Sequence, residues 1–140
     1  MSKRISKGGC HCGRIRIEVI GEPIASVHCH CSDCQKITGA AAEAAALFPV
    51  ENIKVTKGEP KSYPTQGESG ESLHRYFCGN CSTPLIGKPD AMPDIASITI
   101  PSLDDSSFIT EIGHIYTDHA ASWTDIPKDA QKFPKMPPLG

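Results

Sequence analysis

Short runs of alternating apolar and polar residues, with the two-residue period of a β-strand, recur along the chain. In the clearest run, residues 14–19, three aliphatic side chains would share one face and three charged side chains the other. Comparable runs span residues 52–56, 73–77, 95–100 and 112–117. Clusters rich in Gly, Pro, Ser and Asp separate them, which is typical of turns. The pattern predicts an all-β domain.

Residues 40–47 do not fit this pattern. The segment is rich in alanine and contains Glu43, and both residue types favour a helix. It lies between strand candidates, however, where tertiary packing can override local propensity. From propensity alone the segment is a helix candidate.

Prolines gather near the C-terminal end, and for residues 127–140 we expect an extended, weakly ordered tail. The preceding part, about residues 7–126, would form the core of one domain. A chain of 140 residues fits a single hydrophobic core, and no internal repeat is visible. We therefore treat residues 1–140 as a single domain.

The composition leaves room for only a modest core. Apolar residues make up 39% of the chain and aromatic residues only 6%, and short chains with limited cores often add metal or disulfide cross-links. The seven cysteines would serve that purpose. Trp123, the only tryptophan, is expected to pack into the core because of its large apolar area.

The charge balance excludes one functional class. Lys and Arg total 14 against 16 Asp and Glu, which gives a net charge of -2. No basic run extends beyond Lys3-Arg4. Because such a surface does not attract phosphate backbones, we expect no nucleic-acid partner.

Neither a secretory signal nor a membrane span is visible in the sequence. The basic residues near the start have no apolar stretch behind them, and the longest apolar stretch, residues 40–50, contains Glu43. A bilayer span needs about 20 apolar residues. The sequence therefore predicts a soluble, cytoplasmic protein with no membrane partner.

This location bears on the cysteines, because reducing compartments keep thiols free of stable disulfides. An odd number of cysteines also leaves one thiol over in any full disulfide scheme. A disulfide framework is thus the weaker interpretation, and metal binding the stronger one.

All seven cysteines fall into three tight clusters, 10–12, 29–34 and 78–81. In the C-x-x-C pair of Cys78 and Cys81, the intervening backbone can curl so that both sulfurs face one ion. In the C-x-C pair of Cys10 and Cys12, both side chains leave the same face of an extended segment. Together these two pairs offer four thiolates, whereas Cys29, Cys31 and Cys34 offer three.

Structural zinc is usually closed by four protein ligands, while catalytic zinc generally has three and keeps one position open. A four-plus-three division therefore predicts two Zn²⁺ ions per chain, one of them open to substrate. Two alternatives remain at this point. A histidine could complete the second site, the candidates being His11, His28, His30, His74, His114 and His119. Another division would join Cys10, Cys12, Cys29 and Cys31, and leave Cys34 with Cys78 and Cys81.

The sequence around these clusters resembles the glutathione-dependent formaldehyde-activating enzyme family, also called the Gfa-like or centromere protein V group. The resemblance rests on the segments 9–13, 29–34 with Thr38-Gly39, and 77–81, and continues through 103–105, 114–116 and Trp123. It covers about residues 7–134. The chain departs from the family pattern at Gln35, where Arg is frequent, at Ser82, where Gly is common, and at Pro101.

The resemblance implies a zinc-stapled β-tent of antiparallel sheets, in which residues 40–47 form a strand. It also implies a structural zinc on Cys10, Cys12, Cys78 and Cys81, and an open zinc on Cys29, Cys31 and Cys34. The implied reaction is that of a carbon-sulfur lyase, which forms or cleaves S-hydroxymethylglutathione from glutathione and formaldehyde. The implied partner is a small-molecule thiol or its aldehyde adduct.

Proton transfer in such a reaction needs a group near the open site. His30 and Asp33 are candidate catalytic residues because they lie within the central cysteine cluster, and His28 precedes it. A competing hypothesis is a zinc-stabilised protein-interaction module without catalysis, because fold does not fix function.

Overall fold

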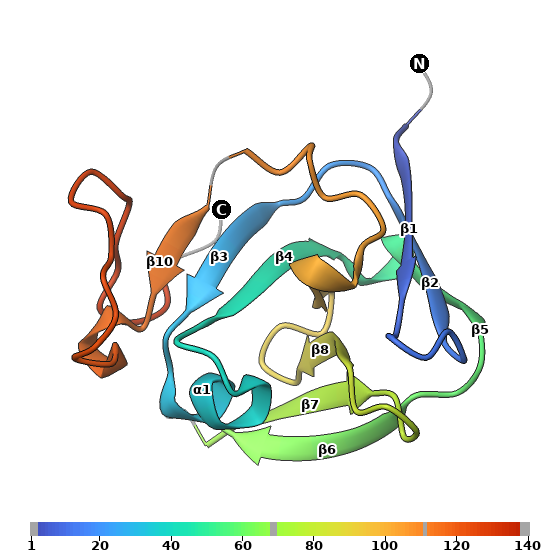
Figure 1. The fold of residues 1–140 in the computed structure, drawn as a ribbon, viewed down its shortest axis with the longest axis horizontal. Coiled ribbons are helices and arrows are strands. Elements are labelled where there is room, and N and C mark those ends of the chain that lie inside the picture. Colours follow the sequence, from blue (N-terminus) through green and yellow to red (C-terminus); the bar gives the residue numbers. More distant parts are fainter. Residues whose placement is uncertain (1–2, 68–69, 111, 138–140) are drawn as a thin grey trace.

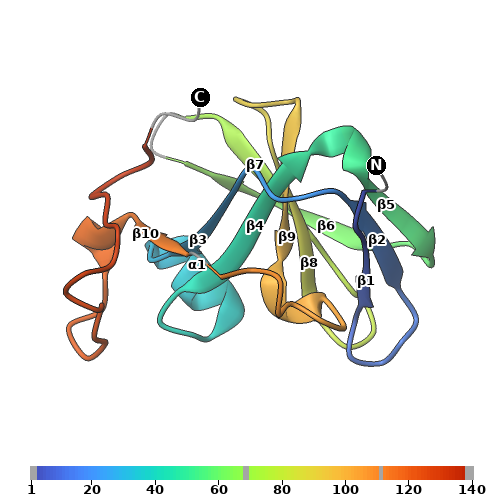
Figure 2. The same ribbon diagram turned by 90° about the horizontal axis from the view of Figure 1, so that it is seen from above.

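The computed structural model describes residues 3–67, 70–110 and 112–137, which form two β-sheets and one short α-helix (Figure 1). The smaller sheet is antiparallel and has the order β1 (Ile5–Gly9), β2 (Arg16–Ile20), β5 (Ile53–Lys57). Figures 1 and 2 show this sheet on one side of the molecule, opposite the end that carries β10 (Gly113–Ile115). The all-β prediction is confirmed.

The larger sheet has seven strands in the order β10-β3-β4-β9-β8-β7-β6. All its neighbours pair antiparallel except β10, which runs parallel to β3. The remaining strands are β3 (Ala25–Cys29), β4 (Glu43–Pro49), β6 (Lys61–Gln66), β7 (Ser72–Phe77), β8 (Pro84–Pro89) and β9 (Ile95–Thr99). The helical turns are α1 (Ser32–Thr38) and the 3-10 segments η1 (Val50–Asn52), η2 (Ile100–Ser102) and η3 (Thr117–His119).

One face of the large sheet forms the main core with the small sheet. Ala46, Ile98 and Ile86 are successive cross-strand partners, and they share a hydrophobic cluster with Ile17 and Val19 of β2. Ala46, Ile98 and Val19 are fully buried. Removing this apolar surface from water is the main contribution to the stability of such a two-layer arrangement.

The opposite face of the large sheet carries a different row of residues. Ser97, Gly87, Arg75 and Tyr63 are successive cross-strand partners on β9, β8, β7 and β6. Residues directly opposite in an antiparallel ladder project to the same side, and their neighbours in the strand project to the other. A polar row thus lies on the face that does not meet the small sheet.

The five strands expected from alternation correspond to β2, β5, β7, β9 and β10, with ends that differ by a few residues. The helix propensity of residues 40–47 is overridden, because β4 begins at Glu43 and pairs with β3 and β9 on its two edges. Pairing on both edges and the burial of residues 45–48 stabilise the strand against this propensity. Alternation did not find β1, β3, β6 and β8.

Residues 120–137 contain no helix or strand, and part of this segment is hydrogen-bonded to β10. The backbone N–H of His114 donates to the Gln131 carbonyl at 2.8 Å, and that of Phe133 donates to the His114 carbonyl at 2.8 Å. Phe133 and Met136 pack against Val27 and Ile115. Residues 131–136 are therefore held by β10, while residues 138–140 lie outside the described part.

The expected core position of Trp123 is wrong, because 73% of its surface is exposed. Trp123 lies in the connection between η3 and the C-terminal segment, whereas Phe133 supplies the aromatic contact with the sheet. The sequence did not predict this exposure, because the large apolar area of a tryptophan is the same in a loop as in a core.

These two aromatic residues provide a matched test of the fold. Phe133→Ala should lower the free energy of unfolding by about 1–2 kcal/mol, because a partly buried aromatic side chain loses its contacts with the sheet. Trp123→Ala should change it by less than about 0.5 kcal/mol. Thermal unfolding of both variants, followed by circular dichroism, measures the difference. An equal loss in the two variants would contradict this placement of the C-terminal segment.

Candidate metal centres and the adjoining pocket

Four cysteines meet at the end of the small sheet that faces the β7–β8 connection. The Sγ atoms of Cys10, Cys12, Cys78 and Cys81 all lie within 4.8 Å of one another. The Cys10–Cys12 and Cys12–Cys78 sulfurs are 3.6 and 3.8 Å apart. A tetrahedral ion with metal–sulfur bonds of about 2.3 Å would place its ligands about 3.8 Å apart. The donor set and its spacing fit zinc.

Backbone N–H groups point at these sulfurs, as expected for thiolate ligands. The N–H of Ile15 donates to Cys10 Sγ at 3.2 Å, and those of Asn80 and Cys81 donate to Cys78 Sγ at 3.4 Å. The pKa of Cys81 is lowered to about 5 by hydrogen bonds from Thr83 and from the N–H of Cys12. The protein therefore stabilises negative charge at this group.

The departure from the family pattern at Ser82 has a structural consequence. Ser82 adopts a left-handed backbone conformation, with φ of 67°, as its N–H donates to the Cys78 carbonyl at 2.8 Å. Glycine adopts this conformation without a steric cost, whereas most other residues are strained by it. The turn after Cys81 thus keeps its shape with a serine in place of the glycine.

The other three cysteines form a separate group at the junction of β3 and α1. The Sγ atoms of Cys29, Cys31 and Cys34 lie within 4.8 Å of one another. Cys31 caps the helix, since its sulfur accepts a hydrogen bond from the Cys34 N–H at 3.3 Å. The thiols of Cys29 and Cys31 therefore lie with that of Cys34 and apart from those of Cys10 and Cys12, which supports the four-plus-three division. No histidine, Asp or Glu joins either group among the described residues.

The three thiols are arranged to hold negative charge. Hydrogen bonds from the Cys29 and Cys34 thiols lower the pKa of Cys31 to about 2. Donating those bonds raises the pKa of Cys29 to about 12, and the pKa of Cys34 also rises. A cation would be bound here by a group that already favours one thiolate.

A buried ion pair borders this group. Arg75 Nη2 donates to Cys34 Sγ at 3.6 Å, and Arg75 Nη1 lies 3.7 Å from Glu43 Oε2. The two side chains are only 10% and 14% exposed. Burial lowers the pKa of Arg75, but Cys34 and Glu43 outweigh it, so that the net pKa is raised and the guanidinium stays charged. Burial raises the pKa of Glu43, and Arg75 partly offsets this.

Sequence reasoning missed Arg75 and Glu43. A signal was present, because Leu73, Arg75 and Phe77 share one face of a predicted strand and a charged residue at an inward-facing position needs a partner. The partner could not be named, since Glu43 lies on a strand that is not adjacent to β7.

The two candidate catalytic residues lie in different surroundings. His30 is 3% exposed, and its Nε2 lies 2.9 Å from Nδ1 of His114, whose ring also stacks on His28. Among the described residues, His30 Nδ1 is the buried side-chain atom without a hydrogen-bond partner. Asp33 is exposed in the first turn of α1. The structure thus separates a buried imidazole cluster from a solvent-facing carboxylate.

The departure at Gln35 also has a structural role. Gln35 Nε2 donates to the carbonyl oxygens of His30 at 2.8 Å and of His119 at 3.0 Å. It therefore ties α1 to the end of β3 and to η3. A neutral amide occupied in this way does not supply the positive charge of an arginine.

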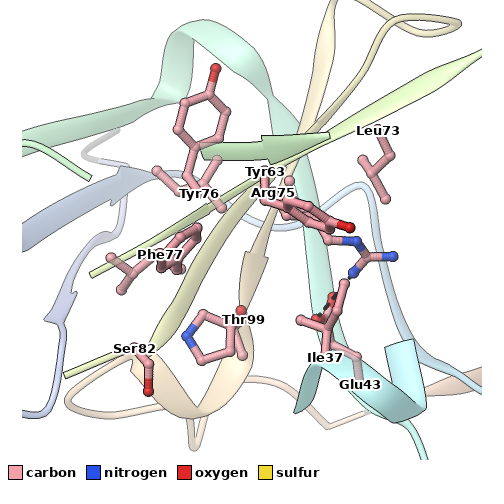
Figure 3. Close-up of a pocket in the computed structure, with 14 residues that line it drawn as sticks. Ile37, Glu43, Tyr63, Leu73, Arg75, Tyr76, Phe77, Ser82 and Thr99 are labelled. Carbon is pink, nitrogen blue, oxygen red and sulfur yellow. Dashed lines mark ion pairs between the residues drawn. The ribbon is translucent and has the colours of Figure 1, made fainter. Parts of the chain in front are cut away.

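A pocket of about 300 Å³ is lined by Arg75 and Glu43, the ion pair that borders the three-thiol group, although the three cysteines are not among its lining residues. Residues of α1 and of strands β4 and β6–β9 line it, among them Ile37, Glu43, Tyr63, Leu73, Arg75 and Phe77. Figure 3 shows the Arg75 guanidinium on the same side of the pocket as Tyr63 and Ile37, with Phe77 and Ser82 towards the other end. Pockets of this size beside reactive groups are typical small-molecule sites.

Comparison with known proteins agrees with this geometry. The family model described as glutathione-dependent formaldehyde-activating enzyme matches residues 5–119. The chain belongs to this family. Its enzymes are carbon-sulfur lyases, and the chain is an enzyme of that class.

Two individual proteins are similar to the chain. A Halomonas elongata protein named "Putative glutathione-dependent formaldehyde-activating enzyme" is 24% identical over an alignment 131 residues long, and the match covers 86% of this chain and 80% of that protein. A crystal structure of a Rhodobacter sphaeroides protein superposes with a TM-score of 0.59 at 22% identity, and covers 77% of this chain and 98% of that one. At this identity the second match shows the fold alone.

No helix in the described ranges has the length and apolar character that a bilayer span requires.

The ion pair beside the three thiols can be tested by a double-mutant cycle. Arg75→Met and Glu43→Gln should each lower the free energy of unfolding by about 3 kcal/mol, because each leaves a buried polar partner unpaired. The double variant should lose less than the sum of the two, by about 1–3 kcal/mol. Urea unfolding of the four proteins measures this difference, and strict additivity would argue against a direct interaction.

Proposed function

We propose that the chain is a zinc-dependent lyase that forms or cleaves the carbon–sulfur bond of a thiol–aldehyde adduct. S-hydroxymethylglutathione, from glutathione and formaldehyde, is one such adduct. The observation that carries the proposal is the division of the seven thiols into a group of four and a separate group of three beside a pocket.

The proposal assigns two Zn²⁺ ions per chain. Cys10, Cys12, Cys78 and Cys81 would hold a structural ion, because four thiolates complete a tetrahedron. Cys29, Cys31 and Cys34 would hold the second ion and leave one position for substrate. Zinc at the second group would lower the pKa of a thiol or polarise an aldehyde oxygen. The proposed location is the cytoplasm, a reducing compartment in which the seven cysteines would stay available as metal ligands.

The chain's own residues would then prepare the reaction. Three thiolates with one Zn²⁺ carry a net charge of -1 by formal count, and the buried Arg75 guanidinium beside Cys34 offsets it. In the forward direction the substrate thiol loses its proton, its sulfur bonds to the aldehyde carbon, and the aldehyde oxygen gains a proton. His30 and Asp33 are the proposed proton carriers.

The two candidates differ in position. The His30 imidazole is buried and hydrogen-bonded to His114, the cross-strand partner of His28, so it projects from the face of β3 opposite to Cys29 and would need a water molecule or a movement of its ring to reach the substrate. Asp33 is solvent-exposed, so that water competes with the substrate for its carboxylate.

Metal content tests the assignment of the cysteines. We expect about two zinc ions per purified chain on the four-plus-three division. Cys34→Ala should lose one ion and keep the folded state, because the three-thiol group lies within a single strand–helix junction. Cys78→Ala should unfold the domain, since its group connects distant segments. Elemental analysis with circular dichroism measures both. Unfolding of Cys34→Ala with Cys78→Ala intact would reverse the assignment.

Catalysis distinguishes the lyase from a protein-interaction module. The zinc-loaded protein should accelerate exchange between free thiol plus formaldehyde and their hemithioacetal at least tenfold over the uncatalysed rate. Cys34→Ala should lose this acceleration. Exchange spectroscopy by NMR measures the rate directly. An unchanged rate with glutathione and with other small thiols would favour the interaction module.

A further inference from the structure

We infer that the pocket beside the three thiols binds the organic substituent of the adduct, and that this substituent is uncharged and apolar. The inference rests on the proposed lyase function and names its substrate class. The preferred adduct would carry an aryl or branched alkyl group, contributed by its thiol or by its aldehyde, and this group rather than the charged body of glutathione would occupy the pocket.

The first observation is the position of the pocket. Arg75 lines it and at the same time contacts Cys34 Sγ at 3.6 Å. Ile37 lines it from the helix that carries Cys34, one turn further along. Cys29 is the cross-strand partner of Glu43, which also lines the pocket. A molecule that reacts at the thiols would therefore extend its substituent along this face of the large sheet.

The second observation is the chemistry of the wall. Leu73, Phe77 and Ile37 supply aliphatic and aromatic surface, and Tyr63 adds a second ring near Arg75 (Figure 3). Glutathione carries two carboxylates and one ammonium group, and each charge buried here would need its own partner. An apolar substituent requires none.

The third observation is that the charged groups of the wall, Arg75 and Glu43 among the described residues, are paired with each other. Arg75 is further occupied by Thr65, whose hydroxyl oxygen accepts from Nε at 3.1 Å, and by Cys34. A substrate carboxylate would have to displace Glu43 from this pair. The neutral Gln35, whose amide already donates to two carbonyl groups, supplies no replacement cation.

The fourth observation is the shape of the floor. Gly87 lies between Arg75 and Ser97 in the cross-strand row, and its lack of a side chain leaves room there. A Cβ at this position would lie 2.7 Å from Ser97 Oγ and 3.5 Å from Leu73 Cδ1. Ser97 Oγ is the end of a short side chain that can rotate, so a larger residue would fill the pocket without a direct contact with the cysteines.

The test compares three substrate pairs on the zinc-loaded protein by NMR exchange: phenylmethanethiol with formaldehyde, glutathione with benzaldehyde, and glutathione with formaldehyde. Acceleration of either aromatic pair should exceed that of glutathione with formaldehyde at least tenfold in kcat/KM. The first two pairs separate an apolar thiol from an apolar aldehyde as the source of the substituent. Equal or greater acceleration of glutathione with formaldehyde would overturn the inference and leave the lyase function standing.

The variant Gly87→Val tests whether the substituent lies in the pocket. This variant should reduce the preference for the aromatic pairs over glutathione with formaldehyde at least tenfold, because the valine side chain takes the space of the aryl group. Gly67→Val is the matched control, since Gly67 lies in a loop outside the pocket and a Cβ there would be 3.9 Å from the Glu71 carbonyl oxygen, the nearest atom among the described residues; this variant should keep the preference. A preference that survives in Gly87→Val would place the substituent elsewhere.

Binding gives a readout that does not depend on turnover. Phenylmethanethiol should shift the backbone amide signals of Leu73 and Gly87 in a two-dimensional NMR spectrum, and glutathione at the same concentration should shift them less. If no pair is accelerated but these shifts appear, the lyase proposal fails and the pocket assignment stands. If the amides do not respond to phenylmethanethiol, the pocket assignment fails whatever the rates are.

Discussion

The meeting of four thiols between distant segments is the constraint on which the rest of the structure depends. Cys10 and Cys12 follow β1 of the small sheet, and Cys78 and Cys81 follow β7 of the large sheet. The core between these sheets contains few aromatic side chains, so a metal cross-link at their junction would add stability that burial alone does not supply. The junction also fixes β7, and with it the position of Arg75.

The large sheet uses its two faces for different purposes, and strand alternation is the reason. Ala46, Ile98 and Ile86 point to the core, and the next row, with Ser97, Gly87 and Arg75, points to the pocket. A one-residue shift of register would exchange these two sets. The close packing of Ala46, Ile98 and Ile86 in the core therefore also fixes the register of the row that faces the pocket.

The fold was predictable from the sequence where one face of a strand is apolar and the other polar. β2 satisfies this condition, whereas β1 ends in two glycines, β6 contains a proline and exposes most of its residues, and β8 begins and ends with proline. For α1, only seven residues long and capped by a cysteine, no helical period is measurable. Segment 40–47 was read correctly only through the family resemblance, because its alanines favour a helix in isolation.

The spacing of the cysteines within each cluster is visible in the sequence, and it predicted which residues could bind a metal. Which clusters meet at one site is decided by the fold. The pairing of Arg75 with Glu43 was not predictable, because a buried ion pair is a property of two strands that the sequence does not place together. Their presence gives the pocket its character. Because Arg75 and Glu43 neutralise each other, the pocket offers mainly apolar walls to a ligand, and such walls exclude water. A thiolate that loses its hydration there becomes a better nucleophile. An apolar substituent that displaces the remaining water would thus contribute to binding and to reactivity through the same contact.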